Sequence, residues 1–81
     1  MEACLAVLRL AEQVVRSGNP NAATDGAVGA LLAHAGLRGA VLNVRVNLSG
    51  IDDTAFIASS QSAVEDALAE ANLLIERIMG R

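Results

Sequence analysis

The sequence contains no lysine, tryptophan or tyrosine, and cysteine, histidine, proline and phenylalanine each occur only once. A single cysteine, Cys4, excludes a disulfide framework. The usual zinc-ligand spacings are also missing, so we expect no metal site. The absence of lysine, together with six scattered arginines and a formal net charge of −3, argues against a nucleic-acid partner.

The chain is short but unusually apolar. Its 81 residues hold one small domain, which we place at residues 1–81, and 53% of them are hydrophobic. A domain of about this size buries only about 60% of the surface of its unfolded chain. It therefore cannot easily hide so much apolar surface alone, and we expect a homo-oligomer, a dimer or larger.

No membrane span is expected from the sequence. Arg9, His34, Arg38 and Arg45 interrupt the apolar stretches, which fall short of the roughly 20 clean residues that a span requires. The first residues, Met1 to Cys4, also lack the basic region of a signal peptide. The sequence therefore predicts a soluble, cytoplasmic protein.

Three breaks divide the chain: Ser17 to Asn21, the glycine pair Gly36 and Gly39, and Ser49 to Asp52. Before the first break, a four-three-four spacing predicts a helix over residues 2–17 with this apolar stripe: Cys4, Leu8, Ala11, Val15. After it, Thr24 or Asp25 is a candidate cap for a second helix. We expect this helix to bury the following residues: Val28, Leu31, Leu32, Ala35.

Residues 40–48 are ambiguous. Leu42 to Leu48 alternates apolar and polar residues, as a half-buried strand does. On a helix, Asn43 and Asn47 share one face instead. A lone strand would find no partner except in another copy, so a helix is preferred.

The last segment carries the clearest pattern. Asp52 or Asp53 is expected to cap a helix that continues to Met79 and is about 40 Å long. Its seam follows a four-three-four-three spacing, as in a coiled coil: Val64, Leu68, Ala71, Ile75, Ile78. The predicted fold is all-α, a small helical bundle with a long C-terminal helix, completed by oligomerisation.

Few residues suggest chemistry. Asp25 is either a carboxylate available for proton transfer or a helix cap. Asn43 and Asn47 either present amides to a polar ligand, or satisfy exposed backbone at a helix end or bond across a subunit interface. Arg45 points roughly opposite them on a helix, as an anion clamp or a surface ion pair. His34 is expected to be packed or solvated rather than catalytic.

Three runs of residues resemble a known family. They are residues 18–25, 39–48 and 51–53, which contain a Gly-Asn turn, a Thr-Asp pair, an Asn-Val-Arg-Val-Asn-Leu run and a following aspartate pair. Their order and spacing over about 35 residues resemble the C-terminal part of the cyclodeaminase/cyclohydrolase family of formiminotransferase-cyclodeaminase and methenyltetrahydrofolate cyclohydrolase. The glycine-rich N-terminal segment of the family has no counterpart, so we expect a truncated domain that lacks the N-terminal half.

The resemblance implies a helical, dimeric protein and folate one-carbon chemistry, with a tetrahydrofolate derivative as substrate and no metal. It also favours a helix over residues 40–48. Carried onto this sequence, it implies that Asp25 handles a proton while Asn43 and Asn47 bind the substrate. We add Arg45 as a further candidate binding residue. The alternatives are a non-catalytic folate binder and a structural helical oligomerisation module.

Overall fold

A computed structural model describes residues 1–80 of the chain, and these residues form three α-helices and no strand. The helices are α1 (Glu2–Arg16), α2 (Pro20–Leu48) and α3 (Thr54–Met79). The predicted all-α class is confirmed, as is a long C-terminal helix, although α2 is longer still. The completion of the bundle by oligomerisation stays a prediction.

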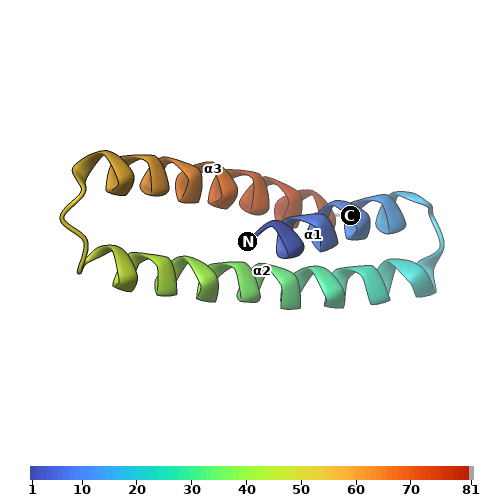
Figure 1. Cartoon of the computed structure of the whole chain (residues 1–81). Helices are drawn as coiled ribbons and strands as arrows, with labels where there is room; N and C mark the ends of the chain where they lie inside the picture. The colour runs from blue at the N-terminus through green and yellow to red at the C-terminus, as the bar shows by residue number, and fades with distance from the viewer. Residues whose placement is uncertain (81) are drawn as a thin grey trace.

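The molecule is a rod of 50 × 17 × 15 Å. Helices α2 and α3 form a long antiparallel hairpin, and α1 folds back along α2 from the other end (Figure 1). Because α1 has 15 residues and α2 has 29, α1 accompanies only the half of the hairpin nearest residues 17–19. The hairpin therefore has a three-helix half and a two-helix half.

Helix α1 buries nearly the predicted stripe. Its buried residues are Leu5, Leu8, Ala11 and Val15. Cys4, which was expected in this stripe, is only half-buried. It lies at the edge of the contact with α2, where its Sγ is 3.3 Å from the position that a Cβ on Gly36 would take.

Helix α2 begins earlier than expected. Gly18 takes a positive φ of 85°, and Asn19 then caps the helix by accepting hydrogen bonds from the backbone N–H groups of Asn21 (3.1 Å) and Ala22 (3.3 Å). Pro20 occupies the first helical position, where its missing N–H costs nothing. The prediction of a cap at Thr24 or Asp25 is therefore wrong, because Asp25 lies in the second turn.

The break expected at Gly36 and Gly39 is also absent, because α2 runs through both glycines to Leu48. A glycine within a helix costs only about 1 kcal/mol, which packing can offset, whereas a proline would interrupt it. Residues 40–48 are therefore helical, and the strand alternative is excluded.

The buried face of α2 differs from the predicted one. The residues expected in the core are all exposed: Val28, Leu31, Leu32, Ala35. The residues that α2 buries are instead Ala30, Ala33, Leu37, Val41 and Leu48. Small residues face α1 because the two helices lie close together: a Cβ on Gly26 would be 3.3 Å from the side chains of Val14 and Val15. Beyond this close contact α2 also buries the larger Leu37, Val41 and Leu48, whereas Val28, Leu31 and Leu32 remain exposed.

Helix α3 is capped as predicted, since the Asp53 side chain accepts a hydrogen bond of 3.0 Å from the Phe56 backbone N–H. Its buried stripe is shifted from the predicted seam and consists of Val64, Ala67, Ala71, Leu74 and Ile78. Leu68 and Ile75 are only half-buried, at its edge. The buried stripe differs from a coiled-coil seam because α3 packs against two helices, α1 and α2, and not against a single partner helix.

Among residues 1–80, α2 is the one helix whose length and mean hydropathy of 1.4 would suit a membrane crossing. Only 22% of that apolar window is buried inside the chain. The core helix of a soluble protein meets the same criteria, so this property alone assigns no membrane location.

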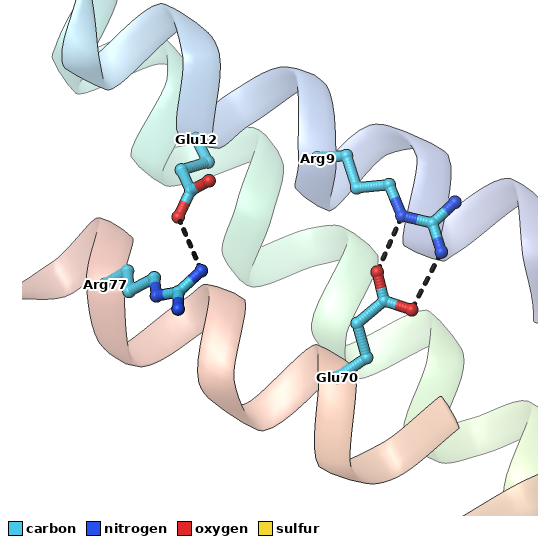
Figure 2. Close-up of polar contacts among 4 residues, drawn as sticks. All are labelled: Arg9, Glu12, Glu70 and Arg77. Atoms are coloured by element: carbon cyan, nitrogen blue, oxygen red, sulfur yellow. Dashed lines mark hydrogen bonds and ion pairs between the residues drawn. The ribbon is translucent and has the colours of Figure 1, made fainter. Parts of the chain in front are cut away.

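Two ion pairs join α1 to α3 along one side of the rod (Figure 2). Arg9 donates two hydrogen bonds to the Glu70 carboxylate, of 2.6 and 2.7 Å, and Arg77 lies 3.7 Å from Glu12. The hydrogen bonds from Arg9 hold the pKa of Glu70 below its ordinary value. Both pairs fix how α1 lies on α3.

Truncating a fully buried leucine should destabilise this fold strongly. Leu37 is 0% exposed. We expect Leu37→Ala to lower the free energy of unfolding in urea by about 2–5 kcal/mol. The matched control is Leu10→Ala, because Leu10 is 61% exposed on α1, and it should change stability by less than about 0.5 kcal/mol. Equal effects of the two variants would contradict the packing described here.

Removing the Glu70 charge should destabilise the fold at neutral pH but not in acid. The lowered pKa of Glu70 means that its contribution to stability is present above the ordinary glutamate pKa of about 4.3 and is lost as the pH falls through the folded-state value. We expect Glu70→Gln to lower the thermal midpoint at neutral pH and to match the wild type in acid, once Glu70 is protonated in the folded state as well. A difference that grows in acid would contradict this sign.

Candidate functional site

All four residues singled out from the sequence lie on α2, and all four are exposed. A helix rises 1.5 Å per residue, so Asp25 is about 27 Å from Asn43 and about 33 Å from Asn47 along the axis. Asn43 and Asn47 are successive residues on one side of the helix. The structure therefore brings the two amides together and leaves Asp25 apart from them.

The exposure of Asn43 and Asn47 changes how their amides are interpreted. A buried amide without a partner would cost about 1–3 kcal/mol, whereas an exposed one bonds to water. Water can therefore satisfy the hydrogen-bonding groups of these two side chains, and the fold does not have to supply partners for them. They are free to meet a ligand or another polypeptide.

Arg45 lies on the opposite side of α2 and lines a groove between α2 and α3. The groove holds a cavity of about 410 Å³, lined by Arg38, Val41, Leu42, Arg45, Leu68 and Asn72. Arg38 and Arg45 are seven residues apart, two helical turns, so both guanidinium groups project on the same side. Apolar side chains form the floor between them.

Two further cavities continue from Arg45 toward the end of α2. One, of about 200 Å³, is bounded by Gln61 and Glu65 of α3. The other, of about 400 Å³, reaches Ser49 and Ile51 in the turn between the helices. Arg45 lines all three cavities, which follow one another from Arg38 along the hairpin to its turn.

The arginines of the groove differ from the other described arginines in their partners. Arg9, Arg16 and Arg77 each lie within 4.0 Å of a glutamate. Within residues 1–80, neither Arg38 nor Arg45 has such an ion pair. Two unpaired cations in a chain of net charge −3 make this groove the clearest place for an anionic ligand.

His34 is held at the edge of this region. Its Nε2 lies 2.8 Å from the Asn72 Oδ1, which joins α2 to α3. The side chain is half-buried, in agreement with the prediction of a packed or solvated histidine. The bond orients Asn72, one of the polar side chains that line the groove. Sequence spacing could not pair residues 38 positions apart.

Three features of this surface were missed in the sequence: Arg38 as a companion of Arg45, Asn72, and the path to the turn. The spacing of Arg38 and Arg45 was a usable signal, because residues seven apart lie on one side of a helix. No sequence pattern could have predicted that Asn72 of α3 lines the groove, since this depends on how α3 packs against α2. Within residues 1–80, no cluster of metal-ligating side chains is present.

Comparison with known proteins identifies the class. A model of the formiminotransferase-cyclodeaminase family matches residues 1–66, which include α1, α2 and the first half of α3. The chain belongs to the formiminotransferase-cyclodeaminase family. The resemblance inferred from the sequence motifs is confirmed. The match contains Arg38, Arg45 and the three polar candidates of α2, and it ends before Asn72.

A particular relative is the methenyltetrahydrofolate cyclohydrolase of Methylorubrum extorquens (strain AM1), which is 49% identical to the chain over 75 residues. The aligned part covers 93% of this chain but only 36% of the relative. The chain therefore spans about a third of the length of the curated relative that it matches. No solved structure matches it.

Proposed function

We propose that the chain takes part in folate one-carbon chemistry of the cyclohydrolase or cyclodeaminase type, with a tetrahydrofolate derivative as ligand. The observation that carries the proposal is the 49% identity to a methenyltetrahydrofolate cyclohydrolase, in a segment that contains the unpaired arginine pair. Folates end in a glutamate, whose carboxylates are ligands that guanidinium groups favour.

The groove suggests an orientation for such a ligand. Its carboxylates bind Arg38 and Arg45, and its apolar middle lies over Val41 and Leu42. The ring end then lies toward Ser49 and Ile51, where α2 stops and the helix no longer separates the groove from Asn47. Asn47, in the last turn of α2, supplies an amide hydrogen bond to the ring or to the one-carbon unit, whereas Asn43 lies one turn earlier, on the side of α2 away from the groove.

The chemistry needs few groups. In the cyclohydrolase reaction, water adds to the methenyl carbon, the bond from that carbon to N5 breaks, and one proton is released. In the cyclodeaminase reaction, N10 attacks the formimino carbon and ammonia leaves. A carboxylate that accepts a proton and amides that hold the carbon serve either course, which is the role proposed for Asp25, Asn43 and Asn47. Asp25 of the same chain is about 33 Å from Asn47 and cannot serve the same ligand.

That separation favours a second candidate function, a folate-binding module without turnover. A chain that holds the ligand through Arg38 and Arg45 but cannot present Asp25 to it would bind and not react. Turnover of methenyltetrahydrofolate, followed by the loss of its absorbance, distinguishes the two functions. Binding of tetrahydrofolate without turnover selects the module, and the absence of both selects a structural helical protein.

Removing the Arg45 guanidinium should weaken ligand binding. We expect Arg45→Ala to raise the dissociation constant for tetrahydrofolate about tenfold, the equivalent of about 1.4 kcal/mol for a charge-assisted contact. Calorimetric titration measures this. Arg16→Ala is the matched control, because Arg16 is an exposed arginine of α1 that lies outside the groove, and it should bind as the wild type does. Equal weakening in both variants would point to overall charge rather than to the groove.

Replacing the amide of Asn47 tests the ring end of the ligand. We expect Asn47→Leu to weaken binding of tetrahydrofolate about five- to tenfold through the loss of one or two hydrogen bonds. Asn21→Leu, at an exposed asparagine in the first turn of α2, is the control and should have no effect. Unchanged affinity of the Asn47 variant would remove Asn47 from the site.

A further inference from the structure

The contact between His34 and Asn72 fixes the orientation of an amide at one end of the groove. The Nε2 of His34 lies 2.8 Å from the Oδ1 of Asn72. A carboxamide oxygen accepts hydrogen bonds and carries no hydrogen, so the hydrogen in this bond belongs to the histidine Nε2. His34 is therefore the donor, and Asn72 accepts through its oxygen.

The other end of the Asn72 amide is left for the groove. The Oδ1 and Nδ2 atoms diverge from one carbon, so an oxygen turned toward His34 leaves the NH2 group turned away from it. Asn72 lines the cavity of about 410 Å³, whereas His34 does not. Within residues 1–80, the NH2 group donates a hydrogen bond to no other residue. Two N–H donors of Asn72 are therefore available to a ligand in the groove.

The donors of Asn72 lie near one of the two arginines of the groove. The hydrogen bond places Asn72 level with His34, and Arg38 follows His34 by four residues on the same side of α2, a rise of about 6 Å. Arg45 is about 10.5 Å further along α2. A guanidinium from α2 and an amide NH2 from α3 thus meet at one end of the groove, and both groups can only donate.

We propose that Asn72 and Arg38 together bind one carboxylate of the ligand, with Asn72 as a binding residue and His34 as the residue that positions it. This inference rests on the proposed function, in which the ligand ends in a glutamate with two carboxylates. Arg45, about 10.5 Å along the helix from Arg38, binds the other carboxylate. The family match ends at residue 66 and so assigns no role to Asn72.

The substitution Asn72→Asp separates binding from structure, because the same bond also joins α2 to α3. A carboxylate at this position still accepts the hydrogen bond from His34, but it has no N–H group to offer and repels an anion. We expect a thermal midpoint no lower than that of the wild type, and a dissociation constant for tetrahydrofolate raised at least about tenfold in calorimetric titration. Asn21→Asp is the matched control, since Asn21 is exposed and lies outside the groove. Equal weakening by both substitutions would overturn the proposal.

The positioning role of His34 has its own test. We expect His34→Leu to raise the dissociation constant for tetrahydrofolate about three- to fivefold, because the Asn72 amide is then free to turn. His34→Gln should restore binding, since a glutamine places an amide N–H at a similar distance from the backbone. In an Asn72→Ala background, His34→Leu should cause no further loss. A further loss in that background would show that His34 does not act through Asn72, and would overturn this role.

Amides of the ligand test whether Asn72 contacts a single carboxylate. The probes are 4-aminobenzoylglutamate, which is the carboxylate end of folate without its ring, and its two monoamides. Amidation removes the charge that Asn72 and Arg38 bind in one monoamide and leaves it in the other. We expect Asn72→Asp to weaken binding of the parent compound and of one monoamide, and to leave the affinity for the other unchanged. Equal weakening for both monoamides would contradict a contact with one carboxylate.

The same titrations distinguish this inference from the proposed function. Tetrahydrofolate that binds the wild type but is insensitive to Asn72→Asp would overturn the inference and leave the proposed function in place. Sensitive binding of 4-aminobenzoylglutamate, with no greater affinity for tetrahydrofolate, would refute the proposed function alone, because the ring would then contribute nothing. A wild type that binds neither compound would overturn both.

Discussion

The structure depends on the contact between α1 and α2, in which small residues allow two helices to lie unusually close. A Cβ on Gly26 would lie only 3.3 Å from the side chains of Val14 and Val15, and Ala30 on the same helix is fully buried. Ala30 and Ala33 are buried together with Leu37, Val41 and Leu48, whereas other large aliphatic residues of α2, such as Leu32 and Val46, are exposed. The same contact that holds α1 in place therefore leaves α2 apolar on its far side.

This arrangement also decides what the polar residues can do. One helix of 29 residues carries Asp25, Asn43, Arg45 and Asn47, so their mutual distances are fixed by helix geometry and cannot be adjusted by loops. The groove exists because α3 closes against the same helix and adds Leu68 and Asn72 opposite the arginines. The groove beside Arg38 and Arg45 thus follows from the packing of α3 against α2.

The described arginines fall into two groups, those paired with a glutamate of the chain and those that line the groove. Arg9 and Arg77 form ion pairs with Glu70 and Glu12, which link α1 to α3 within the chain (Figure 2). Arg38 and Arg45 lie where no described carboxylate reaches them within an ion-pair distance. An arginine that the fold does not use is available to a ligand, because its charge has not been neutralised by the protein.

The sequence by itself determined the helical class, the bounds of the first helix to within a residue, the start of the last helix and the family. The stripe of α1 and the Asp53 cap depend on local spacing and local hydrogen bonds, which periodicity reports well. The motifs around Asn43 and Asn47 identified the family because their order along the chain is itself the signal. Only the tertiary structure decided which side of α2 is buried, since both sides are apolar and the hydrophobicity of the residues does not distinguish them. The tertiary structure also showed that α2 continues through Gly36 and Gly39. It showed that α3 completes the groove beside Arg45, which no local pattern could reveal because the contacting residues are distant in sequence.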